Sequence, residues 1–357
     1  MSSQPPPKNI CILRLSAIGD TCHVLAVVRS IQDTWPDAKI TWIIGRIEAL
    51  LLGHIPNIEF IIFDKSAGFS EYSRLRQKLK HRRFDVLLHM QVALRANLAS
   101  AAIRGGRRIG YDRQRAKDLH GLFINERIAS AHEQHVMDAL RSFAAKLGVT
   151  PGPPRWDIPL LAEDTDYAEE HVDPGRKTLC VSPVSSHKLR NWHVEGYARV
   201  ADHAATRHDM QVILTGGPND FERDFSAAIE SAMQTKPLNL TGKDTLRQLA
   251  ALLGRSDLLL APDTGPMHIA TAMGTDVLGL HAASNPRRSG PYLSGRWCVD
   301  QYDAAARKYL KRSADQIRWG SKIEKPGVMD LITIEQVTDK LDGWVANSTK
   351  AADIDQE

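Results

Sequence analysis

The sequence predicts an α/β protein built from two Rossmann-like domains that face each other across a cleft. Three observations carry this prediction: strand and helix patterns alternate in both halves, a proline-rich segment interrupts them, and the two halves begin alike. Such alternation favours parallel sheets with helices on both faces. The 357 residues are enough for two domains with separate cores.

The first half of the chain, residues 1–150, alternates apolar runs of strand length with stretches of helical periodicity. The predicted strands are residues 10–15, 40–44, 58–63, 86–89 and 107–110. The predicted helices are residues 24–35, a short piece near residue 50, and residues 72–80, 94–103 and 133–147. This order predicts one Rossmann-like domain over residues 1–150.

A linker and a second domain follow. Residues 149–159 read VTPGPPRWDIP, and their four prolines and one glycine are typical of a connection between domains. The second domain, residues 151–330, has predicted strands at 179–182, 212–215, 258–261 and 277–280 and helices at 194–206, 221–233 and 246–253. Its start, KTLCVSPVSSHK, resembles KNICILRLSAIGD near the N-terminus: each runs from lysine through an apolar strand into a loop of small residues. Residues 331–346 are expected to hold a last helix, and the polar tail 347–357 is predicted to be disordered.

Composition and charge exclude several classes of protein. The net charge of +4 does not indicate a nucleic-acid partner, and no apolar run has the length that crosses a bilayer. Residues 1–8 are polar and proline-rich, so we expect no signal peptide and a cytoplasmic location. The four cysteines lie far apart without metal-ligand spacing, which favours reduced, buried thiols.

The stretch LLLAPDTGPMHIATAMGTDVLGLHAASNPRRSGPY, residues 258–292, is the most informative. A buried strand leads into a turn in which Gly265 is expected to take a backbone path closed to other residues. Pro266 suits the first helical turn, where its missing N–H costs nothing. The free N–H groups of this helix start, beside the Thr264 hydroxyl, predict an anion site suited to a diphosphate. The alternative is an ordinary N-cap at Asp263 or Thr264.

Two further loops follow predicted strands. In the first domain, residues 16–20 read SAIGD, and Asp20 is either a general base at the mouth of a cleft or a helix cap. In the second domain, residues 185–192 read SSHKLRNW, which brings two hydroxyls and two cations to a strand end, a set that suits a phosphate-rich ligand. Asn191 is the candidate N-cap of the next helix.

Motifs of other enzyme classes are missing from the sequence. There is no GxGxxG, which weakens a dinucleotide dehydrogenase interpretation, and no P-loop, HExxH, paired-cysteine or GxSxG motif. No DxD carboxylate pair stands in a plausible loop. We therefore expect neither a metal nor a cofactor.

Four segments together resemble the heptosyltransferase family of bacterial lipopolysaccharide synthesis, glycosyltransferase family 9. They are SAIGD at 16–20, SSHKLRNW at 185–192, LTGGPND at 214–220 and APDTGPMHIATAMGT at 261–275. They occur in the family's order over nearly the whole chain. A further segment, GYDRQRAKDLHGLFINERI at 110–128, makes heptosyltransferase I the nearest member.

The resemblance implies a GT-B fold and an inverting, metal-independent glycosyltransferase. It implies ADP-heptose as donor and a Kdo-bearing lipid A, an anionic glycolipid, as acceptor. Asp20 matches the catalytic base and Asp263 a residue near the donor heptose. The other matched donor-binding positions are Ser185, Ser186, Arg190, Thr264, Gly265, Pro266, Met267 and His268. The family often has lysine at Arg190, and this departure leaves phosphate binding possible because arginine offers a forked donor pair.

Basic residues are concentrated in the first domain. The run over residues 74–83 is typical of a solvated helix face. A second group is the candidate site for an anionic acceptor, and its members are Arg104, Arg107, Arg113, Arg115 and Lys117. Either group is also suited to an anionic inner-leaflet membrane surface.

Two other functions remain open at this point. One is a nucleotide-sugar epimerase or hydrolase of the same two-domain architecture, which would turn over donor without acceptor. The other is a non-catalytic nucleotide-binding protein, which would not turn over donor at all.

Overall fold

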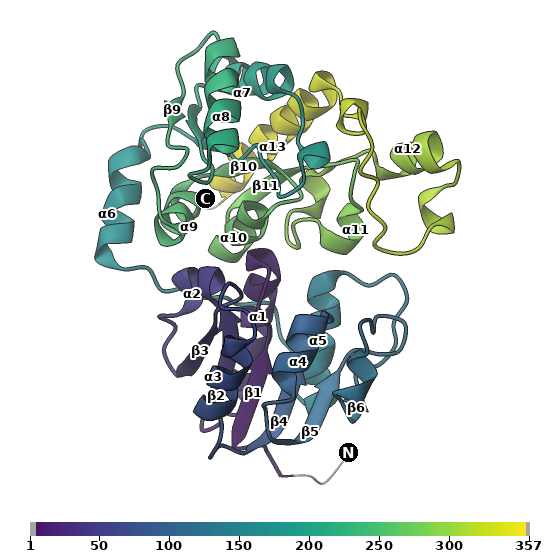
Figure 1. Ribbon diagram of the computed structural model, residues 1–357. Coiled ribbons are helices and arrows are strands. Elements are labelled where there is room, and N and C mark those ends of the chain that lie inside the picture. Colours follow the sequence, from purple (N-terminus) through teal and green to yellow (C-terminus); the bar gives the residue numbers. More distant parts are fainter. Residues whose placement is uncertain (1–4, 355–357) are drawn as a thin grey trace. The chain divides into compact units, whose positions relative to one another are not determined.

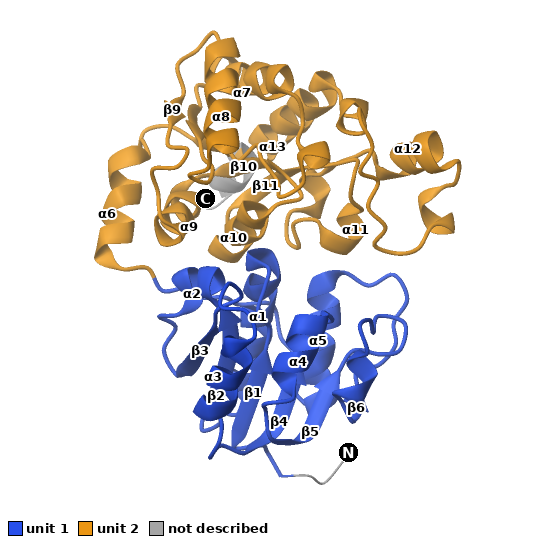
Figure 2. Ribbon diagram, viewed as in Figure 1, with its two compact units in different colours: residues 1–159 blue, residues 160–357 orange. Residues whose placement is uncertain are grey.

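The computed structural model describes residues 5–354, with the backbone alone for residues 349–354. The chain divides into two compact units, Met1–Pro159 (unit 1) and Leu160–Glu357 (unit 2) (Figure 2). Each unit contains one six-stranded sheet with helices packed around it (Figure 1). No helix of the described residues is both long and apolar enough to cross a membrane.

The sheet of unit 1 is parallel throughout. Its strands are β1 (Asn9–Leu13), β2 (Lys39–Gly45), β3 (Ile58–Phe63), β4 (Phe84–His89), β5 (Gly105–Gly110) and β6 (Glu126–Arg127). The helices between them are α1 (Ile18–Thr34), α2 (Arg46–Leu52), α3 (Ser70–Lys78) and α4 (Leu94–Ser100), followed after β6 by α5 (Val136–Leu147).

The sheet of unit 2 is also parallel. Its strands are β7 (Thr178–Val181), β8 (Gln211–Leu214), β9 (Leu238–Asn239), β10 (Leu258–Pro262), β11 (Asp276–His281) and β12 (Val299–Asp300). Its helices are α6 (Ala162–His171), α7 (Val194–His208), α8 (Asp220–Ala232), α9 (Leu246–Arg255), α10 (Gly265–Met273), α11 (Pro286–Ser289), α12 (Tyr302–Ala305) and α13 (Ile334–Ile354).

The strand order is the same in both sheets. It is β3-β2-β1-β4-β5-β6 in unit 1 and β9-β8-β7-β10-β11-β12 in unit 2, which is the 3-2-1-4-5-6 order of the Rossmann fold. The predicted α/β class with two Rossmann-like domains is therefore confirmed. In such sheets ligands bind beyond the carboxyl ends of the strands, where the strand order reverses. These switch points lie between β1 and β4 and between β7 and β10.

Large aromatic side chains anchor the loops that border the switch point of unit 2. The indole of Trp192 is buried and its Nε1 donates to the carbonyl of Ile332 at 3.1 Å. The phenol of Tyr197 is buried and donates to the carbonyl of Pro183 at 3.2 Å. These bonds fix the loop after β7, because a buried hydroxyl or indole N–H without a partner would cost stability.

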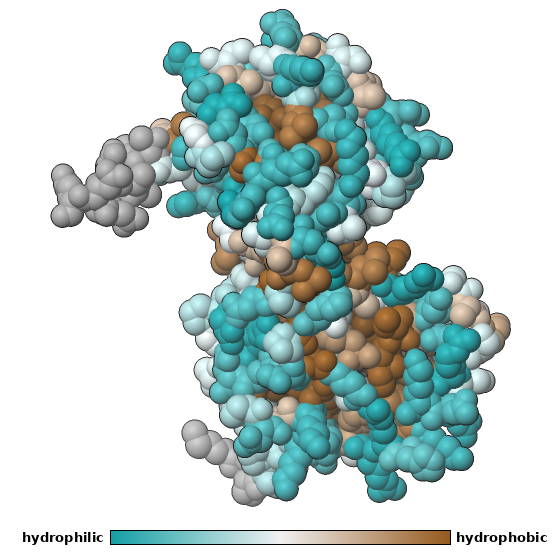
Figure 3. All heavy atoms as spheres, turned by 90° about the vertical axis from the view of Figure 1, so that its left-hand side faces the viewer, coloured by the Kyte–Doolittle hydropathy of each residue, from teal (hydrophilic) through white to brown (hydrophobic). Residues whose placement is uncertain are grey.

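The surface is mostly polar. On the face shown in Figure 3, hydrophilic side chains cover most of each unit and patches of apolar residues interrupt them. Large apolar side chains that are more than half exposed include Phe69, Leu119 and Leu122 of unit 1.

Several predicted boundaries differ from the structure. Helix α1 begins at Ile18 rather than at residue 24, and α5 begins at Val136 rather than at residue 133. Helix α13 extends to Ile354, beyond the predicted bounds 331–346 and into the tail predicted to be disordered, and residues 355–357 lie outside the described residues. Helix α6 was not predicted, because its sequence AEDTDYAEEH buries only Asp164 and Ala168 and shows little apolar periodicity.

Candidate active site

The loops at the switch point of unit 2 bring four charged side chains together. Arg190, which follows β7, places its guanidinium NH1 3.6 Å from the carboxylate of Asp263, which follows β10. Lys322 forms an ion pair with the same Asp263 oxygen. Glu324 lies 3.4 Å from the Nε of Arg190. Sequence analysis predicted Arg190 and Asp263 as residues of one donor site, but it did not predict Lys322 or Glu324.

Asp263 is the buried centre of this group, with 10% of its side chain exposed. Burial raises the pKa of its carboxyl, but Lys322, followed by His281 and His268, more than offsets this effect. The pKa of Asp263 therefore lies well below the usual carboxyl value. Two cations and two carboxylates balance, so Asp263 holds Lys322 and Arg190 in place without a ligand.

The two predicted serines occupy different positions in the loop after β7. Ser185 is buried, and its hydroxyl donates to the carbonyl of His187 at 3.0 Å. Ser186 accepts a 2.8 Å hydrogen bond from Arg190 NH2, so it belongs to the charged group around Asp263. Asn191 is not the predicted helix cap: its Oδ1 accepts from the Ser185 backbone N–H at 2.7 Å, and His193 caps α7 instead.

The loop after β10 leads directly into α10, whose N-terminus carries the predicted anion site. Thr264 is the N-cap residue but makes no side-chain cap bond, and its hydroxyl donates to the Val184 carbonyl at 3.3 Å. The N-cap interpretation of the Thr264 side chain is therefore wrong, and the first N–H groups of α10 keep their capacity to bind an anion. Pro266 lies in the first turn as predicted. Gly265 is the first helical residue and does not adopt a left-handed backbone, contrary to our expectation. Met267, the next residue of this turn, is buried.

His281, at the end of β11, was also not predicted as part of the site. It is fully buried, and its Nδ1 lies 3.3 Å from the hydroxyl of Ser284. Burial lowers the pKa of His281 to about 4, although Asp263 opposes the shift. The imidazole is therefore neutral at physiological pH, and it carries a positive charge beside Asp263 only in the acidic range in which that carboxyl itself titrates.

In unit 1, Asp20 lies in the first turn of α1, directly after β1 and beside the switch point. Ala17 is the N-cap residue, so the interpretation of Asp20 as a cap is wrong. The Asp20 carboxylate pairs with Arg14. Arg14 is itself fixed by hydrogen bonds to the carbonyls of Ser16 and Met90, at 2.7 and 2.5 Å. About a third of the Asp20 side chain, 32%, stays exposed, so the carboxylate is accessible to solvent.

The five candidate acceptor residues do not form one loop. Arg104 directly precedes β5, and Arg107 lies within β5, where its guanidinium bonds both carboxylate oxygens of Glu126 at 2.7 and 3.0 Å. The other three, Arg113, Arg115 and Lys117, follow the carboxyl end of β5. They share the sheet edge of Asp20, since β1 and β5 are separated only by β4, or roughly 10 Å.

The Arg115 side chain is held within that loop. Its Nε pairs with Asp112, its NH1 donates to Gln134 Oε1 at 2.9 Å, and its NH2 donates to the Ala129 carbonyl at 2.9 Å. Arg113 and Lys117 are exposed. An anionic acceptor would therefore meet Arg113 and Lys117 more readily than Arg115.

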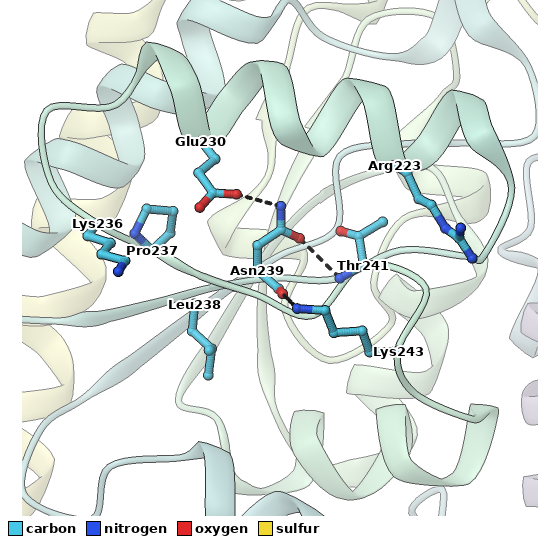
Figure 4. Close-up of a pocket in the computed structure, with 8 residues that line it drawn as sticks. All are labelled: Arg223, Glu230, Lys236, Pro237, Leu238, Asn239, Thr241 and Lys243. Carbon is cyan, nitrogen blue, oxygen red and sulfur yellow. Dashed lines mark hydrogen bonds between the residues drawn. The ribbon is translucent and has the colours of Figure 1, made fainter.

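A separate pocket of about 390 Å³ lies between α8 and the segment around β9 (Figure 4). Asn239 connects two other lining residues of this pocket. The Asn239 side chain donates to Glu230 at 2.8 Å, and the Asn239 carbonyl accepts from Lys243 Nζ at 2.7 Å. None of the sequence-predicted donor residues lines it, and its lining residues are Arg223, Glu230, Lys236, Pro237, Leu238, Asn239, Thr241 and Lys243.

Comparison with known proteins decides the family. The sequence profile of glycosyltransferase family 9 (heptosyltransferase) matches residues 72–315, more than half of the chain. The chain is also 40% identical over 331 residues to the lipopolysaccharide core heptosyltransferase OpsX of Haemophilus influenzae. That alignment covers 93% of this chain and 95% of OpsX. The chain belongs to glycosyltransferase family 9.

Solved structures of this family have the same fold. A family 9 glycosyltransferase of Veillonella parvula superposes with a TM-score of 0.78 at 21% identity, over 95% of this chain and 97% of that one. The E. coli heptosyltransferase WaaC with ADP superposes with a TM-score of 0.67 at 19% identity, over 82% of this chain and 92% of WaaC. The family resemblance, the GT-B fold and the glycosyltransferase class predicted from sequence are confirmed.

Proposed function

We propose that this family 9 enzyme transfers a heptose from ADP-heptose to the inner core of lipopolysaccharide, on a Kdo–lipid A acceptor, with inversion at the anomeric carbon. Support comes from the function named for OpsX and from the ADP bound by WaaC. The main structural observation behind the proposal is a cluster of polar side chains beside the start of α10, at the switch point of the unit 2 sheet. Its members are Ser186, Arg190, Asp263 and Lys322.

The donor diphosphate has three matching partners in unit 2. Arg190 supplies a forked guanidinium, Lys322 supplies a point charge, and the α10 N-terminus supplies backbone N–H groups. As the glycosidic bond to the diphosphate breaks, negative charge grows on the leaving ADP, and fixed donors stabilise that charge most strongly in the transition state. A carboxylate repels phosphate, so Asp263 suits the heptose hydroxyls and the orientation of its two cations.

Asp20 is the proposed general base. An acceptor hydroxyl transfers its proton to the Asp20 carboxylate while the hydroxyl oxygen attacks the anomeric carbon and ADP departs from the opposite face. One displacement of this kind inverts the anomeric configuration. Arg14 orients the carboxylate, and its two hydrogen bonds to the carbonyls of Ser16 and Met90 hold it in place before the acceptor binds.

Exposed apolar side chains accompany the cations proposed for the acceptor. Leu119 and Leu122 lie in the loop that carries Arg113 and Lys117, with 67% and 78% of each leucine exposed. Asp118 of this loop accepts from the Leu94 backbone N–H at 3.1 Å, which joins the loop to α4 and its exposed Leu94 and Leu98. Leucines flanked by cations suit an anionic glycolipid and the membrane surface that carries it.

A coupled assay with and without acceptor tests the proposed reaction. ADP-heptose and purified Kdo–lipid A are supplied, and free ADP and the mass of the lipid are followed together. We expect ADP release to depend on the acceptor and to match heptose gain by the lipid. Equal ADP release without acceptor would instead support a nucleotide-sugar hydrolase.

Replacement of Thr264 by valine tests the donor loop. We expect Thr264→Val to weaken donor binding by about 1.5–3 kcal/mol, because the hydroxyl that would turn from the Val184 carbonyl to the charged diphosphate is lost while the side-chain shape is kept. Titration of ADP by calorimetry measures this effect. Thr271→Val is the matched control, since the Thr271 hydroxyl bonds the Met267 carbonyl inside α10 and should not affect ADP binding.

Removal of divalent metal should leave turnover unchanged. Arg190, Lys322 and the α10 N-terminus supply the charge stabilisation that a metal gives other glycosyltransferases. Within the described residues, no donor residue belongs to a cluster of three or more metal-binding groups. Initial rates measured in EDTA should equal those without it, and a loss of rate that magnesium or manganese restores would refute metal independence.

A further inference from the structure

A cluster of two histidines and an aspartate lies in unit 2, on helices that the proposed reaction does not use. His203 and His208 come from α7 and Asp342 comes from α13. Both histidine Nε2 atoms approach the same oxygen of Asp342, Oδ1, at 2.7 and 2.6 Å. The potential ligand atoms of the three side chains all lie within 4.8 Å of one another.

The topology places this cluster away from the donor loops. Helix α7 starts after the carboxyl end of β7 and ends at His208, shortly before β8 begins at Gln211. Its 15 residues span about 22 Å, so His208 lies near the amino edge of the sheet, opposite the donor loops. Helix α13 packs along α7. Lys177, just before β7, donates a 3.1 Å hydrogen bond to the hydroxyl of Ser348 in the last part of α13.

We propose that His203, His208 and Asp342 form a binding site for a divalent transition-metal ion such as Zn²⁺, which joins α13 to α7. Two imidazoles and one carboxylate are a ligand set that zinc accepts, with water at a fourth position. The site is part-exposed, with 29%, 16% and 45% of the His203, His208 and Asp342 side chains accessible, so water has access to it.

The geometry requires only a small adjustment to bind metal. Ligands about 2.0–2.1 Å from a tetrahedral zinc lie roughly 3.3 Å apart, somewhat more than the present N···O distances. The two imidazole rings meet at an interplanar angle of 70° with centroids 5.4 Å apart, so they are not stacked against each other. For an ion to bind, both N···O distances must therefore lengthen by roughly 0.6 Å.

The competing explanation is a hydrogen-bonded cluster that needs no metal. Burial raises the pKa of Asp342, but hydrogen bonds from His203 and His208 outweigh it and lower the pKa. These bonds would hold α13 on α7 by themselves. The two explanations differ in one respect: only the metal site predicts tight, stoichiometric binding of zinc.

Calorimetric titration of ZnCl₂ into the full, untagged, metal-stripped chain tests the proposal. We expect one ion per chain and a rise in Tm of roughly 5–10 °C at a free zinc concentration a hundred times the dissociation constant. Co²⁺ in place of Zn²⁺ should give a visible absorption spectrum of low-coordinate cobalt with nitrogen ligands. Chelation should reverse the Tm rise without changing the initial rate of ADP release.

Variants of the three proposed ligands test whether zinc binds at this cluster. His208→Gln and Asp342→Asn should each weaken zinc binding more than about 100-fold, because each removes one of three ligands. Asp342→Asn keeps an oxygen that accepts hydrogen bonds, so its Tm without metal should stay close to that of the wild type. His132→Ala is the control for unspecific binding, since His132 is an exposed histidine of unit 1. Absence of stoichiometric zinc binding, or equal binding by the wild type and both site variants, would overturn the proposal.

Discussion

The substitution Asp20→Asn should lower kcat by roughly 10²–10⁴-fold while leaving the fold and donor affinity close to normal. The amide keeps the size of the carboxylate and an oxygen that accepts the Arg14 hydrogen bond, but it cannot take a proton. The stability change should be small, about 0–1 kcal/mol, because the Arg14–Asp20 pair is partly exposed on the Asp20 side. Initial rates of ADP release, Tm and ADP titration measure the three quantities.

A second carboxylate of unit 1 provides the matched control. Asp85 in β4 accepts from the backbone N–H groups of Lys8 and Asn9 at 2.7 and 2.9 Å, at the opposite edge of the same sheet. Asp85→Asn should change Tm but not kcat. If Asp20→Asn instead behaves like Asp85→Asn, with nearly wild-type turnover, Asp20 is only the structural partner of Arg14 and the proposed mechanism is wrong.

The substitution Lys322→Gln should lower kcat/KM for the donor by roughly 10²–10³-fold. It removes the cation that we propose to face the leaving diphosphate, and the same cation pairs with Asp263. We expect ADP binding to weaken and kcat to fall, because the charge on the leaving group is largest in the transition state. Kinetics at varied ADP-heptose concentration, together with ADP titration, separate these two effects.

The same substitution should also lower stability, by about 1–3 kcal/mol near neutral pH. The folded-state pKa of Asp263 lies below its unfolded value, so the ionised carboxyl stabilises the fold above the ordinary carboxyl pKa. That contribution is lost as the pH falls through the folded-state pKa. Without Lys322 the Asp263 pKa rises, and part of the contribution disappears at neutral pH.

Two further variants separate binding from structure. Lys322→Arg keeps the charge and should restore part of the ADP affinity, although its planar group fits a different geometry. Lys325→Gln, at an exposed position nearby, should change neither affinity nor Tm. If Lys322→Gln lowers Tm but leaves ADP binding and kcat unchanged, Lys322 only neutralises Asp263 and does not contact the donor.

The sequence predicted the fold class well because strands such as β1 and β10 are continuous apolar runs that end in loops of small residues. The short strand β6 has only two residues, Glu126 and Arg127, and carries no such signal. Because β6 was not predicted, the pairing of Glu126 with Arg107 could not be predicted either, and Arg107 was included among the candidate acceptor residues.

The sequence predicted only those residues of the candidate site that lie in the loop directly after a strand. Arg190 and Asp263 belong to loops after β7 and β10, whose motifs are local in sequence. Lys322 lies 59 residues after Asp263 in the sequence. Its segment is fixed by a hydrogen bond of 2.8 Å from the Ile323 N–H to the Ala283 carbonyl. His281 ends an apolar strand, where its burial beside Asp263 depends on packing of both strands. Such contacts arise from tertiary structure, and no residue spacing in the sequence predicts them.

The most direct test of the proposed function is the fate of the heptose when the enzyme meets ADP-heptose and Kdo–lipid A. Mass spectrometry of the lipid and NMR of the new glycosidic linkage, measured beside ADP release, report transfer and stereochemistry in one experiment. We predict one heptose added per ADP released, with the anomeric configuration opposite to that of the donor, and almost no product from Asp20→Asn. Free heptose in place of a modified lipid, or a linkage that retains the donor configuration, would contradict the proposal.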